Sequence, residues 1–333
     1  MMELIQKLVE TPAPPGYESQ IREVIRAEIE PYADEVRIDA LGNLIATKGK
    51  DKPAAPKIML AAHMDEIGII VTHVDENGFA RFSGLGGIRP HTCMGGRVRF
   101  LNGTLGVIGY EQLEDQNKLP TFEQMYVDVG ASSRDECPLR VGDVAVFDRP
   151  FSKLGKRLVA KAMDDRIGVA ILVETLRQLQ QTPHLLYFVF SVQEEVGLRG
   201  ATTAAYGLAP DIGIAVDVTR SGDTPRGIKM EVSLGKGPAI KVRDSGMIAD
   251  RRVVDWMVRT AEQAKLPYQL EVLEAGTTDA RAIQLTRAGV PSGCLSIPCR
   301  YIHAPSEMVD ADDVHNAVRL LLNLLSQEVS GVI

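Results

Sequence analysis

This sequence has no excess of basic charge, no long apolar run and no closely spaced pair of cysteines. A net charge of -7 and a pI near 5.5 argue against a nucleic-acid partner, which a basic face would recognise. No apolar run approaches the roughly 20 residues that span a bilayer, so we expect no membrane contact. The 4 cysteines form no CxxC pair, which favours reduced thiols over a disulfide scaffold. The opening residues MMELIQKLVE read as an amphipathic helix rather than a secretory signal, so we expect a cytoplasmic protein.

What remains is the composition of a folded α/β protein, with 45% apolar and 24% charged residues. Short apolar runs that predict buried strands occupy residues 57–65, 185–195 and 212–219. Helical periodicity fills residues 165–180. A last helix is predicted from Asp310, because Asp310 and Asp313 have the spacing of an N-cap and its N3 acid.

The stretch at residues 71–154 has a different pattern, made of short β-like pieces separated by glycines. Asn102-Gly103 between two alternating runs predicts a hairpin. We therefore predict a small all-β domain at 71–154, inserted into an α/β domain made of residues 1–70 and 155–333.

Imidazole and carboxylate side chains cluster where the predicted strands end. His63 and Asp65 close the first strand, and its period of two places both on one face, where the carboxylate could orient a metal-bound imidazole. The alternative is a core histidine paired with an acid. Glu194 and Glu195 follow the second strand; either they are solvated, or one binds a metal while its neighbour carries a proton.

Further candidates come from Asp164, Asp217 and His303. Asp164 and Asp165 precede a predicted helix, so one is a candidate N-cap and the other a candidate bridge between two cations. Asp217 ends the third strand, and His303 lies in an irregular segment flanked by proline. The carboxyl ends of strands in an open α/β sheet form its usual active-site edge. Imidazole and carboxylate donors without cysteine suit a catalytic site for Zn²⁺, Co²⁺ or Mn²⁺.

These residues stand in segments that resemble the M42 metallopeptidases, a family that includes the tetrahedral and glutamyl aminopeptidases. The matching segments are AAHMDEIG, KAMDDRIG, SVQEEVGLRGA, AVDVT, SLGKGP, AGTTDA and IPCRYIHAPSE. They keep the family's order from near residue 60 to beyond residue 305, so the resemblance covers most of the chain.

The resemblance implies a metal-dependent aminopeptidase that acts on peptides through two divalent cations per subunit. Its implied ligands are His63, Asp164, Glu195, Asp217 and His303, with Asp164 bridging the cations. Glu194 is the implied general base, which activates a water that bridges the metals, and Asp65 the implied partner of His63. Thr278 and Asp279 in AGTTDA are expected only to line the pocket.

The same resemblance implies an α/β/α catalytic domain like those of zinc peptidases, with an inserted PDZ-like β domain. That inserted domain is expected to form dimers, and the dimers to assemble into a dodecamer. The preferred amino-terminal residue of the substrate does not follow from the sequence.

Two other classes of hydrolase also use paired carboxylates. A glycoside hydrolase would more often show aromatic platforms, whereas this chain has a single tryptophan and places two histidines beside its acids. A related dinuclear amidase or deacylase would carry its extra domain between the fourth and fifth ligands. Here the β-like insertion falls between His63 and Asp164, which favours the M42 pattern.

Overall fold

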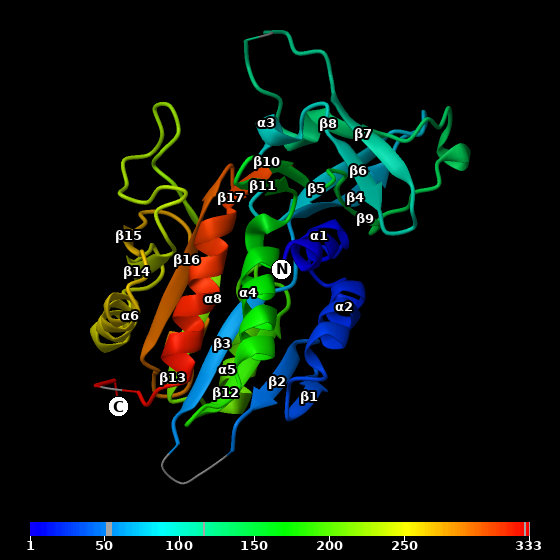
Figure 1. The fold of residues 1–333 in the computed structure, drawn as a ribbon. Coiled ribbons are helices and arrows are strands. Elements are labelled where there is room, and N and C mark those ends of the chain that lie inside the picture. Colours follow the sequence, from blue (N-terminus) through cyan, green and yellow to red (C-terminus); the bar gives the residue numbers. More distant parts are fainter. Residues whose placement is uncertain (51–54, 116, 330, 333) are drawn as a thin grey trace.

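The computed structural model describes residues 1–50, 55–115, 117–329 and 331–332. Within these ranges, eleven strands form one mixed sheet that is the centre of the larger part of the molecule (Figure 1). In spatial order its main path runs through β1 (Glu35–Ile38), β2 (Leu44–Lys48), β12 (Leu185–Ser191), β3 (Lys57–His63), β13 (Ile212–Arg220), β16 (Ser292–Arg300), β17 (Glu307–Asp310), β11 (Arg157–Ala160) and β10 (Ser152–Leu154). Strands β14 (Ala239–Arg243) and β15 (Gln269–Val272) branch from β16.

Strands β12, β3, β13 and β16 are parallel to one another, so their carboxyl ends meet at one edge of the sheet. Apolar side chains fill both faces of these strands, as buried parallel strands require. The three buried strands predicted from the sequence are confirmed as β3, β12 and β13.

Helices cover both faces of the sheet. One face is packed by α1 (Met2–Glu10), α2 (Ser19–Ile29), α4 (Met163–Gln178), α6 (Arg251–Gln263) and α8 (Ala311–Leu325), which share one large apolar core with it. The other face is packed by α5 (Arg199–Leu208) and α7 (Asp279–Gln284) over a smaller core. No helix in the described ranges is both long and apolar enough to cross a membrane.

A closed β-barrel stands apart from the sheet at the top of Figure 1. Its strands are β4 (Gly68–Val74), β5 (Ala80–Leu85), β6 (Arg97–Phe100), β7 (Leu105–Tyr110), β8 (Met125–Asp128) and β9 (Val144–Phe147). The short helix α3 (Pro90–Cys93) and the 3-10 turns η1 (Phe122–Gln124) and η2 (Arg134–Glu136) lie between them. The barrel has an apolar core of its own. Its likeness to a PDZ domain stays a prediction.

The predicted division into residues 1–70 with 155–333 and residues 71–154 also stays a prediction. It includes positions 51–54, 116, 330 and 333, which lie outside the described residues. The barrel strands begin at Gly68 and end at Phe147, and β10, inside the predicted β domain, pairs with β11 in the large sheet.

Asp310 caps α8 as predicted, because its side chain accepts a hydrogen bond from the backbone N–H of Asp312. Asp313 has a different role from the predicted N3 acid of a capping box. Its carboxylate accepts hydrogen bonds of 2.7 Å from the backbone N–H groups of Gly235 and Gly237, so it holds the loop before β14 against α8. Sequence spacing alone cannot separate these two uses of the same carboxylate.

A buried ion pair joins the two chain segments that lead into the candidate site. The Nζ of Lys161 lies 2.8 Å from both carboxylate oxygens of Glu66, and the backbone N–H of Ala13 donates to the same carboxylate. Arg166, which is fully buried, donates to the carbonyl oxygens of Met64 and Thr11. These contacts fix the end of β3 against the start of α4.

Candidate metal centre

The candidate ligands come from separate elements that meet at the carboxyl edge of the parallel strands. His63 ends β3, and Asp217 lies near the end of β13. Asp164 is in the first turn of α4, where its backbone is not helical. Glu195 follows β12, and His303 lies between β16 and β17. With the exception of His63, they line a cavity of about 960 Å³.

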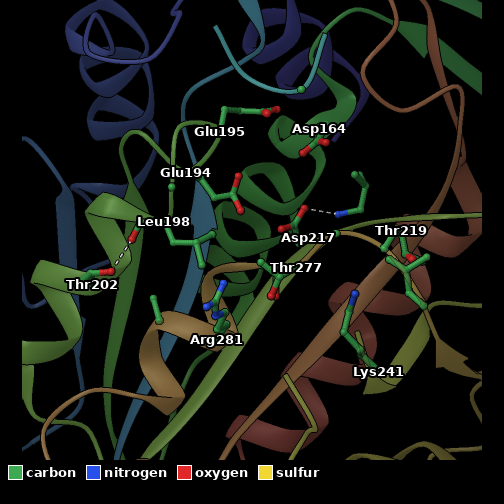
Figure 2. Close-up of a pocket in the computed structure, with 18 of the residues that line it drawn as sticks. Asp164, Glu194, Glu195, Leu198, Thr202, Asp217, Thr219, Lys241, Thr277 and Arg281 are labelled. Atoms are coloured by element: carbon green, nitrogen blue, oxygen red, sulfur yellow. Dashed lines mark hydrogen bonds between the residues drawn. The ribbon is translucent and has the colours of Figure 1, made fainter. Parts of the chain in front are cut away.

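Asp164 occupies the middle of this cluster. Its Oδ1 lies 2.9 Å from Nε2 of His63, and its Oδ2 lies 3.3 Å from Nε2 of His303. His303 Nε2 is also 3.4 Å from Oε2 of Glu195. Figure 2 shows the carboxyl groups of Asp164, Glu195 and Asp217 directed toward a common space. Each oxygen of Asp164 therefore faces a different histidine.

The donor atoms fall into two sets that share one residue. The first set is His63, Asp164 and Asp217, and the second is Asp164, Glu195 and His303. Within each set the donor atoms lie within 4.8 Å of one another, which brings them near enough to bind a common ion. The sets contain every ligand expected from the sequence, and Asp164 is the residue that they share.

The electrostatics of the cluster also fit cations. Burial raises the pKa of Glu195 to about 7; His303 opposes the change, and Asp164 adds to it. Burial, followed by repulsion from Asp164, raises the pKa of Asp217 well above its usual range. The Oε1 atom of Glu195 is buried without a hydrogen-bond partner in the described part of the chain. Crowded, buried carboxylates with a free oxygen are stabilised when a positive ion joins them.

The pKa values of the two histidines respond to the carboxylates beside them. Burial lowers the pKa of His63, but its hydrogen bonds to Asp164 and Asp65 outweigh burial and raise that pKa well above the usual range. The pKa of His303 is raised to about 10, because its hydrogen bond to Asp164 and the nearby carboxylates outweigh the effect of burial. A divalent cation provides the positive charge that these imidazoles otherwise take up as protons.

Glu194 lies beside the two ligand sets and belongs to neither. Its Oε2 is 3.9 Å from Nε2 of His63, and its carboxylate faces the same cavity as Asp164 and Asp217 (Figure 2). Burial raises its pKa well above the usual range; His63 opposes the shift, and Asp217 strengthens it. A carboxylate in this position can exchange a proton with a molecule held between the ligand sets.

Asp65 is fully buried and holds more than one element of the site. Its two carboxylate oxygens accept hydrogen bonds of 3.0 Å from the backbone N–H groups of Glu194 and Glu195. The Nδ1 atom of His63 lies 3.1 Å from the carbonyl oxygen of Asp65 and 3.5 Å from its Oδ1. Asp65 therefore lies against His63 and fixes the backbone of both adjacent glutamates, and its role in orienting a metal-bound His63 stays a prediction.

Three further acids shape the site: Glu307, which was not selected from the sequence, Asp165, a candidate N-cap or bridge, and Asp279, which was expected only to line the pocket. Glu307 accepts hydrogen bonds from the backbone N–H groups of Asp164 at 3.0 Å and His303 at 2.8 Å. Asp165 accepts from Gly168 at the start of α4, the N-cap role left open for one of the two aspartates. Asp279 accepts a hydrogen bond of 2.5 Å from Ser191. Glu307 and Asp279 stand inside the recognised segments IPCRYIHAPSE and AGTTDA, which was the available signal.

A glycine turn from the barrel touches the ligands. A Cβ atom at Gly86 would lie 2.7 Å from Oε2 of Glu195, and one at Gly87 would lie 2.4 Å from Nδ1 of His303. Neither distance is compatible with an unchanged site. Gly86 also has a φ of +80°, a conformation that other residues adopt only with strain. This turn, after β5, forms part of the wall around the second ligand set.

The family model of the M42 glutamyl aminopeptidases matches residues 42–320. A protein of Acetivibrio thermocellus is 48% identical over 329 residues, covering 98% of each chain. The lysyl aminopeptidase of Pyrococcus furiosus is 38% identical, covering 98% of this chain and 96% of its own.

Solved structures give the same result. The aminopeptidase APDkam598 from Desulfurococcus kamchatkensis superposes with a TM-score of 0.94 at 42% identity, covering 98% of this chain and 94% of its own. The TET1 peptidase of Pyrococcus horikoshii, described as able to assemble into a tetrahedron or a large octahedral shell, has a TM-score of 0.89 at 33% identity, with 98% and 99% coverage. The predicted resemblance and the predicted enzyme class, an aminopeptidase that hydrolyses peptide bonds, are confirmed. This chain belongs to the M42 glutamyl aminopeptidase family.

Proposed function

We propose that the chain releases amino-terminal residues from peptides with two divalent cations, Zn²⁺, Co²⁺ or Mn²⁺, in the cavity at the carboxyl edge of the sheet. His63, Asp164 and Asp217 would hold one cation, and Asp164, Glu195 and His303 the other. The observation that carries this proposal is the position of Asp164, whose two oxygens face different histidines. When bound, such cations polarise the scissile carbonyl and make water more acidic.

The protein's own groups supply the proton transfers. The carboxylate of Glu194 accepts the proton of the attacking water and delivers it to the nitrogen of the leaving amine. Asp65 keeps that carboxylate in place through the backbone N–H of Glu194 and positions Glu195 in the same way. The acidic groups at the ligand end of the cavity hold the free α-amine of the substrate, so cleavage is limited to the first peptide bond.

Chelation and refilling test this function. The purified protein is treated with a chelator, refilled with Zn²⁺, Co²⁺ or Mn²⁺, and assayed on a panel of aminoacyl chromogenic substrates and unblocked peptides. We expect chelation to abolish cleavage and at least one metal to restore it. Cleavage that survives complete metal removal would refute the proposal. Preference for N-acyl amino acids would indicate a deacylase, and chelator-resistant hydrolysis of a soluble cellulose derivative a glycoside hydrolase.

The barrel region, predicted as residues 71–154, is proposed to pair subunits, with dimers assembling into a dodecamer in the cytoplasm. Leu101, Leu105 and Val107 of the β6–β7 hairpin are exposed apolar side chains that suit such a contact. The related TET1 peptidase provides the analogy for a large closed assembly. Light scattering of the metal-loaded protein tests it, and a monomeric mass at working concentration would rule the assembly out.

A further inference from the structure

The cavity wall beyond the metal ligands and Glu194 is basic. Among the described residues that line the cavity, the only acids are Asp164, Glu194, Glu195 and Asp217. The charged residues on the rest of its wall are Arg220, Lys241, Arg281 and Arg287. Two bound divalent cations would offset the acids at the ligand end, which leaves the remaining wall with a positive potential.

Two of these cations are already paired. The Nζ of Lys241 is buried and lies 2.7 Å from Oε1 of Glu271. The guanidinium of Arg287 stacks over the ring of Tyr206, with its carbon 4.5 Å from the ring centroid, and its Nε donates to the Tyr206 carbonyl oxygen at 2.7 Å. The ammonium of Lys241 is therefore paired with a carboxylate, and the guanidinium of Arg287 is held against Tyr206.

Arg281 and Arg220 lack such contacts among the described residues, and Arg281 is the one whose charged end Figure 2 shows in the cavity. Its side chain is exposed, and within the described part of the chain its guanidinium has no hydrogen-bond or ion-pair partner. Figure 2 shows the nitrogen-bearing end of Arg281 directed into the cavity, toward Thr277 and Asp217. The aliphatic stem passes over Gly246, where a Cβ atom would lie 2.7 Å from Cδ of Arg281. The stem is thus supported while the charged end remains available.

The helix that carries Arg281 is anchored beside the catalytic carboxylate. Thr278 caps the start of α7, and Asp279 accepts the 2.5 Å hydrogen bond from Ser191 at the end of β12. Glu194 follows β12, so the base of Arg281 is fixed relative to the reacting end of the cavity. Arg281 and Glu194 line the same cavity, so a peptide that occupies this cavity can contact both residues.

We propose that Arg281 is a specificity residue that binds a carboxylate of the substrate peptide; this rests on the proposed function. A guanidinium makes two parallel hydrogen bonds to a carboxylate and cannot lose its charge, so it discriminates between an acid and the matching amide. The carboxylate belongs either to an acidic amino-terminal side chain or to the carboxyl terminus of a short peptide. An amino-terminal lysine is disfavoured by the same charge.

Two matched substrate pairs separate these sources. Glu-Ala-amide against Gln-Ala-amide tests the side-chain carboxylate with the terminus blocked, and Leu-Ala against Leu-Ala-amide tests the terminal carboxylate. We expect kcat/KM of the metal-loaded enzyme to favour the acid of one pair by roughly tenfold to a hundredfold, the range of a charge-assisted hydrogen bond. Arg281→Gln should bring that ratio close to one and leave kcat/KM of the neutral member nearly unchanged.

Two control substitutions distinguish a specific binding site at Arg281 from a general electrostatic attraction by the basic cavity wall. Arg287→Gln removes the same charge from the cavity wall, but its guanidinium already engages Tyr206, so the ratio should persist. Loss of the ratio in Arg287→Gln or in Arg220→Gln, with retention in Arg281→Gln, would overturn the assignment. So would the absence of any preference for the acid in both pairs.

Failure of the proposed function would look different, because no peptide, neutral or acidic, would be cleaved with any metal. In that case calorimetric titration of the purified protein with glutamate and with glutamine still decides the role of Arg281. Tighter binding of glutamate that Arg281→Gln removes supports the site, and equal binding of the two refutes it.

Discussion

Glutamine at position 194 or 195 should separate the roles of two neighbouring carboxylates. Each change keeps the shape of the side chain and removes its negative charge. Glu195 belongs to a ligand set whose donor atoms lie within 4.8 Å, whereas Glu194 belongs to neither set and lies 3.9 Å from Nε2 of His63. The backbone N–H of each residue is held by Asp65 at 3.0 Å, so the substitutions should not move the chain.

The expected magnitudes follow from these positions. Glu195→Gln removes one anionic donor from a set of three, and an amide gives no negative charge to a cation, so metal content should fall. Glu194→Gln should keep both metals and lose the proton acceptor. A positioned general base contributes typically 10²–10⁴-fold in rate, which corresponds to about 3–5 kcal/mol of activation free energy.

Paired measurements check this division. Metal content per subunit is determined by mass spectrometry after dialysis, and peptide cleavage is measured on the same samples. Glu23→Gln on the exposed face of α2 is the control and should change neither quantity. If Glu194→Gln empties the site or cleaves at the wild-type rate, the assignment of Glu194 as base is wrong. Full metal content in Glu195→Gln would remove Glu195 from the ligands.

Three other substitutions test the support of the site. Asp65→Asn can satisfy only one of the two backbone N–H groups of Glu194 and Glu195, so urea unfolding should show a loss of about 1–3 kcal/mol, and no loss would contradict this role. Gly87→Ala places a Cβ atom 2.4 Å from Nδ1 of His303, so a chelator competition should show metal binding weakened by about 10–100-fold. In the control Gly207→Ala the new Cβ atom meets nothing within 4 Å, so metal binding should not change. Glu66→Gln leaves Lys161 buried without its carboxylate and should cost about 3–5 kcal/mol of unfolding free energy, and a stability within 1 kcal/mol of wild type would argue against a buried charged pair.

The sequence predicted the strand ends that carry the ligands because buried parallel strands leave a strong local signal. β3 and β13 are continuous apolar runs, and the polar residue at or near the end of each is therefore conspicuous. Once the strands are parallel, His63 and Asp217 must reach the same edge of the sheet. This part of the site follows from local pattern and topology.

Side chains that support the site by accepting hydrogen bonds from backbone N–H groups left no comparable local pattern in the sequence. Glu307 supports Asp164 and His303 through their N–H groups, and these contacts exist only after distant segments meet. For the same reason Asp313 matched the N3 acid of a capping box in sequence but binds Gly235 and Gly237 in the fold. The direction of Arg281 into the cavity likewise depends on how α7 packs, which spacing does not determine.

The glycine turn of the barrel has a consequence for how the protein can be divided. The barrel strands enter the chain after His63 and leave it before Asp164, so both ends of the insertion are attached to segments that carry ligands. A shortened chain without the barrel would retain all five candidate ligands in its sequence. It would lose the wall that Gly86 and Gly87 place against Glu195 and His303. The barrel is therefore not a detachable module, and a list of ligands is an incomplete description of what makes this site.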